Sequence, residues 1–266
     1  MHKIFSHLPV AVCAFLFVSC NGGKKDKNEL KTVPELNPVA VAGMQQDTVE
    51  FPSGDGLMMT AVIYEIDSIS PVVVMCHQAR MSNYEYAEIA PKLNQMGYNC
   101  LALDLRSGGT MDSHQNITFN HAKEKNLPTE YLDAEQDILA GLNYAYDRWH
   151  QPVILWGSSF SAGLCLKIGT TNDKVREIIA YSPGEYYGGK MSLKESIKGL
   201  NKPTYITSTE KEAASIEKIV ADIPEGVITQ YFPDMKGTHG SKALWSTDPS
   251  SGAYWESITE WLSENK

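Results

Sequence analysis

The sequence predicts an α/β protein built on a doubly wound, mostly parallel sheet of eight strands. Short apolar runs, suited to strands buried on both faces, alternate with helical stretches, and one of these runs leads directly into a glycine- and serine-rich turn and a helix. The length of 266 residues suits one large domain, and a composition of 42% hydrophobic and 21% charged residues excludes disordered, collagenous and coiled-coil proteins. A net charge of −9 favours neither nucleic acid nor an anionic membrane surface as a partner.

The N-terminal residues have the pattern of an export signal. Lys3 precedes an apolar run over 8–18 that is too short to span a bilayer. The end of this run, Phe17-Val18-Ser19-Cys20, resembles the bacterial lipobox, which implies cleavage before Cys20 and lipid on its thiol. We therefore expect an exported, membrane-anchored bacterial lipoprotein on the periplasmic or cell-surface side, with an ordinary signal peptide as the alternative. The chain then divides into a signal peptide, a flexible tether and an α/β domain, at residues 1–19, 20–40 and 41–266.

The domain begins with a predicted antiparallel hairpin over 45–66, where strand-like residues flank a turn at 53–56. Further strands are predicted at 72–76, 98–104, 153–156, 178–181, 204–207 and 227–232. Helices are predicted at 84–96, 130–149, 160–171, 211–222 and 250–264. The long connections 105–129 and 182–202 are too short for a second domain, so we expect no large cap domain and a rather open cleft.

Three cysteines fall inside this domain. Cys76 and Cys100 lie in predicted strands and Cys165 lies in a predicted helix, so we expect three buried thiols that pack as small hydrophobic groups. A disulfide between Cys76 and Cys100 is the alternative in an exported protein.

The strongest catalytic signal follows the predicted strand at 153–156. The chain continues as Gly157-Ser158-Ser159-Phe160-Ser161 into a helix, which is the strand–turn–helix context of a nucleophile elbow. Ser159 stands two residues after the first glycine, so it is the expected nucleophile among the three serines. Ser161 occupies the usual place of a second glycine and is small enough for the turn. The Phe160 amide at the start of the helix is the first expected donor to an oxyanion.

A serine nucleophile needs a base, and a carboxylate to orient that base. His239 is the histidine that follows Ser159 in the sequence, and it stands in a glycine-flanked loop before the final helix. Glu212, just after the penultimate strand, is the expected carboxylate, and Glu210 and Asp234 are the alternatives.

Taken in order, these motifs resemble the α/β-hydrolase superfamily, and within it the small dienelactone-hydrolase-like and lipase/esterase members. The resemblance covers about residues 45–264 and rests on Cys76–Ala79, Tyr86–Ala90, Ala102–Gly109, the elbow and the Glu212/His239 pair. It implies the α/β-hydrolase fold and a serine hydrolase that cleaves a small carboxylic ester or related acyl bond through a Ser-His-Glu triad and an acyl-enzyme intermediate.

The resemblance also implies a second oxyanion donor at the Ala79 amide, and it places Gln78, which replaces the usual glycine, in the oxyanion hole as well. We expect His77 to be a structural loop residue. Tyr186, Tyr187 and Arg80 are candidates to line the cleft.

Two other functions remain open at this point. A binding lipoprotein of the same fold without turnover is favoured by three departures from the family pattern: Ser161, Gln78, and Glu212 where related chains usually have aspartate. A peptidase or amidase is a variant of the hydrolase hypothesis. No phosphate-loop motif is present, and no zinc-ligand spacing occurs at Asp112, His114 and His121, so no cofactor or metal is predicted. The sequence leaves the oligomeric state open.

Overall fold

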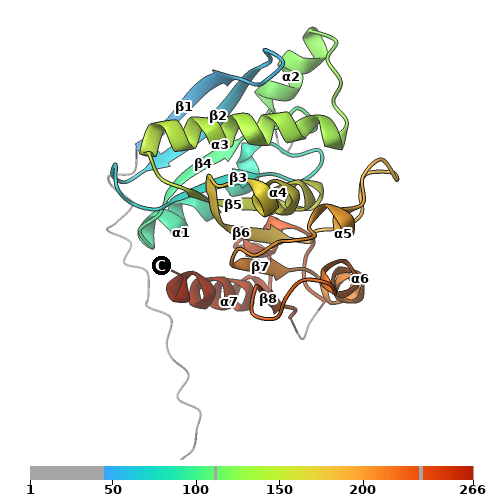
Figure 1. Ribbon diagram of the computed structural model, residues 1–266. Coiled ribbons are helices and arrows are strands. Elements are labelled where there is room, and N and C mark those ends of the chain that lie inside the picture. Colours follow the sequence, from blue (N-terminus) through green and yellow to red (C-terminus); the bar gives the residue numbers. More distant parts are fainter. Residues whose placement is uncertain (1–44, 111–112, 234–235, 266) are drawn as a thin grey trace, which may run out of the picture. The chain divides into compact units, whose positions relative to one another are not determined.

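The computed structural model describes residues 45–110, 113–233 and 236–265. In this part of the chain the strands form one eight-stranded sheet in the order β1-β2-β4-β3-β5-β6-β7-β8, which Figure 1 shows from the blue hairpin at the top to β8 at the bottom. The β1/β2 and β2/β4 pairs are antiparallel, and all other neighbours are parallel. The strands are β1 Gln45–Pro52, β2 Met58–Glu65, β3 Val72–Cys76, β4 Asn99–Leu103, β5 Val153–Ser158, β6 Val175–Tyr181, β7 Thr204–Thr207 and β8 Ile228–Tyr231. The predicted mostly parallel sheet with an N-terminal antiparallel hairpin is confirmed.

Helices cover both faces of this sheet (Figure 1). The α-helices are α1 Ile89–Gln95, α2 Ile117–Glu124, α3 Glu135–Trp149, α4 Phe160–Thr171, α5 Leu193–Ser196, α6 Glu210–Val220 and α7 Ser251–Glu264. The described residues also form the short 3-10 helices η2 Asn83–Tyr86, η3 Tyr131–Ala134 and η4 Ser241–Leu244. Among the described helices, none combines the length and the apolar character needed to cross a membrane.

The two faces of the sheet contribute to separate cores. Along β3, Val72 and Val74 pack in the core under α3 and α4, whereas Val73 and Met75 pack in the core under α1 and α7. All five residues of β3 are buried, and this explains why the strand reads as a continuous apolar run instead of an alternating one.

The two long connections contain short helices that the sequence reading did not predict. Asn116 caps the start of α2 by accepting a hydrogen bond from the Phe119 amide, and Ser192 caps the four-residue α5 in the same way through the Glu195 amide. The connection between β6 and β7 carries only α5, so no large cap covers the carboxyl ends of the strands.

The three cysteines of the domain are buried free thiols, as expected. The alternative disulfide is not formed, and the strand register gives the reason. Cys76 lies opposite Leu103 and Cys100 lies opposite Val73 in the β3/β4 pair, so the two thiols are at different levels of the sheet.

The N-terminal hairpin is tied to the rest of the domain by a buried arginine. Arg106 is fully buried and pairs with Asp55 of the hairpin turn at 2.7 Å and with Asp137 of α3 at 2.8 Å. Ser53 donates a further hydrogen bond to Asp137 at 3.2 Å. Because the charges are paired and multiply hydrogen-bonded, the guanidinium is tolerated in the interior.

Candidate active site

The sharp turn between β5 and α4 presents Ser159. Its backbone angles are φ 60° and ψ −123°, a conformation that residues other than glycine rarely adopt. The turn also needs a glycine at position 157, because a Cβ there would lie 2.4 Å from the Ala162 Cα. The Ser159 amide donates to the Tyr181 carbonyl of the neighbouring strand at 2.8 Å. This is the geometry of the predicted nucleophile elbow.

Ser161, which departs from the usual glycine, braces this turn. Its hydroxyl accepts a hydrogen bond from the Ser158 amide at 2.9 Å and donates to the Cys76 carbonyl at 2.7 Å. The side chain is fully buried. The substitution therefore links the elbow to the end of β3, and it is an integral part of this turn.

Glu212 and His239 form the second part of the site. His239 Nδ1 lies 2.5 Å from Glu212 Oε1. The other oxygen, Oε2, accepts hydrogen bonds from the Ser182 hydroxyl at 2.9 Å, the Thr209 amide at 3.0 Å and the Thr209 hydroxyl at 2.9 Å. Burial raises the pKa of Glu212, but the hydrogen bonds from His239 and Thr209 outweigh it and lower the pKa to about 2. The carboxylate is ionised, and it orients the ring so that Nε2 is left for another partner.

The contact from Thr209 explains why a glutamate stands at this position. Thr209 is the N-cap of α6 and Glu212 is its N3 residue, and the two form a reciprocal capping box. The alternative acid Glu210 is exposed, and in the described part of the chain it forms no hydrogen bond or ion pair with His239. Asp234 lies outside the described residues.

Hydrogen bonds hold the loop that carries His239 beside the elbow. The Gly240 amide donates to the Ser182 hydroxyl at 3.0 Å, and the Ser241 amide donates to the Ser158 hydroxyl at 2.9 Å. A Cβ on Gly240 would lie 2.6 Å from Ser158 Oγ, and its φ of 74° also favours glycine. The loop can therefore approach the residue before Ser159 only with glycine at this position.

Tyr186 stands between the two parts of the site. Its ring meets the His239 ring edge to face, with centroids 6.4 Å apart, and its hydroxyl donates to the Ser182 carbonyl at 3.0 Å. Burial raises the pKa of Tyr186 to about 12, the Glu212 charge adds to this, and a hydrogen bond with the Ser159 side chain opposes it. The tyrosine thus contacts both the predicted nucleophile and the predicted base.

The loop after β3 contains the expected second oxyanion donor. The Gln78 amide is not free, because it donates to Glu85 Oε2 at 2.7 Å. Within the described residues, the amides of Ala79 and Phe160 have no hydrogen-bond partner. Gln78 therefore supports the loop, and Ala79 and Phe160 are left as the available donors.

Glu85 is a part of the site that the sequence reading missed. The carboxylate is fully buried and also accepts hydrogen bonds from Gln78 Nε2 at 3.1 Å and from the Ser158 hydroxyl at 2.7 Å. Burial raises its pKa, and these hydrogen bonds act against that effect. Glu85 links the loop of Ala79 to Ser158, the residue before the predicted nucleophile. Glu85 and Ser158 are 73 residues apart, so no local sequence pattern predicts this contact.

His77 has a structural role, as expected. It is fully buried, its Nδ1 lies 2.8 Å from the Gln78 carbonyl, and its Nε2 accepts the Leu105 amide at 2.9 Å. The ring is therefore neutral with the proton on Nδ1. Burial lowers the pKa of His77 to about 4, although the hydrogen bond to Gln78 opposes this.

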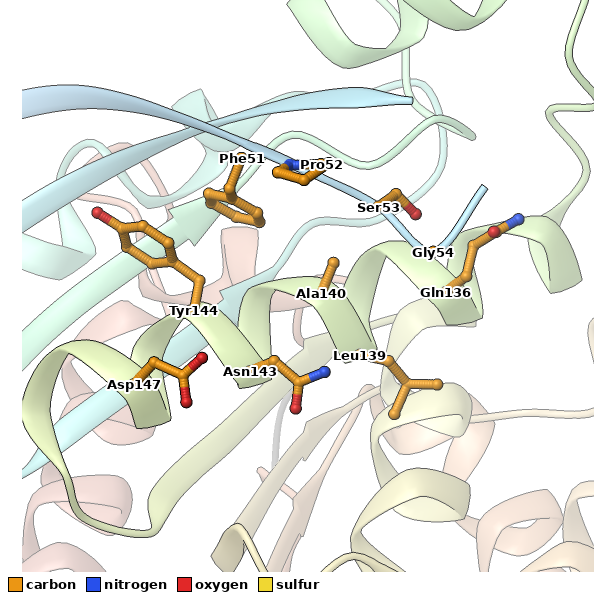
Figure 2. Close-up of a pocket in the computed structure, with 10 residues that line it drawn as sticks. All are labelled: Phe51, Pro52, Ser53, Gly54, Gln136, Leu139, Ala140, Asn143, Tyr144 and Asp147. Atoms are coloured by element: carbon orange, nitrogen blue, oxygen red, sulfur yellow. The ribbon is translucent and has the colours of Figure 1, made fainter. Parts of the chain in front are cut away.

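A separate hollow of about 390 Å³ lies between the hairpin and α3. Figure 2 shows Phe51, Pro52, Ser53 and Gly54 on one side of it and side chains of α3 on the other. The rings of Phe51 and Tyr144 stack at 4.5 Å. No residue of the site described above lines this hollow.

Comparison with solved structures assigns the fold. An esterase of Pyrococcus furiosus superposes with a TM-score of 0.62 at 14% identity, over 91% of this chain and 98% of that chain. The dienelactone hydrolase of Anabaena variabilis superposes with a TM-score of 0.64 at 14% identity, over 83% of this chain and 98% of that one. This chain has the α/β-hydrolase fold. An acylaminoacyl peptidase of Pyrococcus horikoshii also matches, with a TM-score of 0.61 at 14% identity, over 83% of this chain and 41% of that chain.

Neither a protein-family model nor a curated protein sequence matches the chain. At these identities the α/β-hydrolase fold is shared, whereas the activities named for the neighbours belong to those proteins.

Proposed function

We propose that the protein is a serine hydrolase that cleaves a small carboxylic ester or a related acyl bond through Ser159, His239 and Glu212. The observation that carries the proposal is the 2.5 Å distance between Glu212 Oε1 and His239 Nδ1. The loop of His239 is hydrogen-bonded to Ser158, next to the strained backbone of Ser159. The parallel strands β5, β7 and β8 precede Ser159, Glu212 and His239, so all three residues follow carboxyl ends at one edge of the sheet, where this fold places its chemistry.

In this proposal Ser159 Oγ attacks the carbonyl carbon and passes its proton to His239 Nε2. Glu212 holds the ring in the required tautomer and stabilises the imidazolium that forms. The amides of Phe160 and Ala79 bind the oxygen that becomes negative. The imidazolium then protonates the leaving alcohol, and a water molecule activated by the same imidazole releases the acyl group.

Replacement of the nucleophile tests this mechanism. Ser159→Ala is expected to lower kcat for an aryl acetate by roughly 10⁴-fold or more, because the attacking atom is removed. A fluorophosphonate is expected to modify the wild-type protein on the peptide that contains Ser159. Ser263→Ala, at an exposed serine near the end of α7, is the control that keeps both activity and labelling.

The experiment also separates the alternatives. A folded wild-type protein that is neither labelled nor active would favour a binding protein without turnover. Retained hydrolysis in Ser159→Ala would reject the nucleophile. An amide substrate turned over faster than its matched ester would favour a peptidase or amidase.

We also propose that the chain is exported and anchored through lipid on Cys20. The support is the pattern of residues 1–20, an apolar run followed by the lipobox-like Phe17–Cys20. These residues lie outside the described part of the chain.

A further inference from the structure

A hollow of about 530 Å³ lies beside the candidate active site, between α6, the α5 segment and the loop 183–186. Tyr186 and Glu212 form part of its wall, so the hollow adjoins the side chains that contact His239. Its remaining lining is Pro183, Gly184, Glu185, Lys194, Lys211, Ser215, Lys218 and Ile219.

Three lysines line this hollow, and two of them are unpaired. Lys194 is 3.1 Å from Asp222 in an ion pair. Lys211 and Lys218, in the described part of the chain, have neither an ion pair nor a hydrogen bond. With Ser215 they repeat at positions i, i+4 and i+7 of α6, so these side chains share one face of the helix.

The two carboxylates in the wall do not compete for these lysines. Glu212 is occupied by His239, Ser182 and Thr209. Glu185 accepts the amides of Leu193 at 2.7 Å and Lys194 at 3.0 Å. The exposed ammonium groups of Lys211 and Lys218 therefore have no protein partner within hydrogen-bonding distance in the described part of the chain, and an acidic group of a ligand can pair with them.

Tyr186 connects this hollow to the nucleophile. The tyrosine lines both the hollow of the lysines and a smaller one of about 220 Å³, which Tyr131, Leu132 and Tyr187 also line. The ring of Tyr131 stacks on Phe160, the residue after the nucleophile, at 4.5 Å. The Tyr186 side chain therefore lies between the hollow of the three lysines and a hollow with two further tyrosines, which Glu130 and Lys190 also line.

We propose that the cationic hollow is a subsite for an acidic group of the substrate. The inference rests on the proposed hydrolase function and names its substrate class: an ester with a carboxylate on its acyl or its alcohol part. The carboxylate binds Lys211 and Lys218, and the ester carbonyl lies on the Ser159 side of Tyr186.

The test compares kcat/KM for matched charged and neutral esters. One pair carries the charge on the alcohol part, 4-acetoxybenzoate against methyl 4-acetoxybenzoate. The other carries it on the acyl part, the aryl ester of hydrogen suberate against that of octanoate. The wild-type protein is expected to prefer the charged member of at least one pair, and the pair that shows the preference identifies which part enters the hollow. The preference should weaken as salt concentration rises.

The double variant Lys211→Gln/Lys218→Gln is expected to lower this charged-to-neutral ratio about tenfold, equivalent to about 1.4 kcal/mol. Lys211→Arg/Lys218→Arg should retain the ratio, which excludes a folding defect. Lys123→Gln/Lys125→Gln, at exposed lysines near the end of α2, is the matched control for overall charge.

The two proposals fail in different ways. If Ser159→Ala abolishes hydrolysis but the ratio is the same in the wild type and the double glutamine variant, the subsite is rejected and the hydrolase stands. If no ester is cleaved, the proposed hydrolase function is rejected. Calorimetric titration with suberate then tests the anion subsite independently of catalysis. Saturable binding that the double glutamine variant loses supports it, and absence of such binding in the wild type overturns it.

Discussion

At the scale of single residues, the site places its ionisable side chains in opposite environments. Glu212 is held ionised by donors on both oxygens, whereas His77 is held neutral by complete burial. Glu212 lies in the first turn of α6 and His77 lies in the loop after β3, and one is suited to orient a base and the other to hold a loop. Burial and hydrogen bonding, and not the type of residue, decide these roles.

The burial of His77 predicts a pH dependence of stability. The unfolded chain binds a proton at this residue near pH 6.5, and the folded protein resists it down to about pH 4. The unfolded state therefore binds more protons in this window, so the stabilisation is complete above pH 6.5 and is lost as the pH falls toward 4. The difference of pKa corresponds to about 3 kcal/mol of unfolding free energy.

Urea unfolding of the wild type and His77→Gln at a series of pH values measures this effect. The wild type is expected to lose more stability than the variant between pH 6.5 and 4. Burial raises the pKa of Asp104 to about 6, so this residue favours the folded state as the pH falls, in the wild type and in the variant alike. The effect of His77 is therefore the difference between the pH slopes of the two proteins. His114→Gln, at an exposed histidine, is the control, and equal slopes for the wild type and His77→Gln would contradict the prediction.

At the residue scale, the sequence predicts the local geometry of the site best where chain order fixes it, whereas the catalytic roles stay predictions. Ser159 was identified by its glycine two residues earlier, and the structure gives it the angles of an elbow. Glu212 and His239 were predicted as a pair, and they are in contact. Glu85 and Ser182 were missed, because their roles depend on partners that are distant in the sequence.

At the scale of elements, the loop between β8 and η4 has to approach the elbow closely. Gly240 of this loop lies against the side chain of Ser158, and the preceding residue is His239. A Cβ at Gly240 would have two effects, the strain of a positive φ and a collision with Ser158.

Gly240→Ala and Gly199→Ala measure these effects separately. Both positions have a positive φ, 74° and 88°, but a Cβ on Gly199 meets nothing within 4 Å, whereas one on Gly240 would meet Ser158 Oγ at 2.6 Å. Each variant is expected to lose about 1 kcal/mol of stability from backbone strain. Only Gly240→Ala should also lower kcat/KM for a neutral aryl ester, by roughly 100-fold, because the base is displaced.

Urea unfolding measures the loss of stability in both variants, and steady-state kinetics measures the loss of kcat/KM. Equal kinetic losses in the two proteins would show that strain alone acts. Full activity in Gly240→Ala would show that the loop does not position His239.

The connections between elements were the least predictable part of the fold. The helices α2 and α5 are short and begin at single capping residues, Asn116 and Ser192, so no long apolar periodicity marks them. In contrast, α4 was predicted at 160–171 and observed as Phe160–Thr171, because a buried strand and a tight turn fix its start.

At the scale of the whole molecule, alternation of strands and helices was enough to predict a doubly wound sheet. The spatial order of the strands, with β4 between β2 and β3, cannot be read from apolar periodicity. The sequence analysis accordingly predicts no strand order, and the order is a finding of the structure.

Attachment of the whole chain to a membrane is a prediction from sequence that can be tested directly. Cys20→Ser in bacterial cells is expected to abolish incorporation of labelled palmitate and to move the protein from the membrane fraction to the soluble fraction, because the acylated thiol is lost. Cys13→Ser changes a cysteine inside the segment expected to be removed, so it should alter neither readout. Palmitate incorporation that persists in Cys20→Ser would reject the anchor.

The reciprocal hydrogen bonds between Thr209 and Glu212 have a consequence for the dynamics of the proposed active site. The same carboxylate begins α6 and holds the imidazole of His239. When the first turn of α6 frays, the proposed base loses its orienting partner, so local unfolding and loss of activity become one event. A compound that binds the imidazole should therefore slow amide exchange at the start of this helix, although it touches no backbone there.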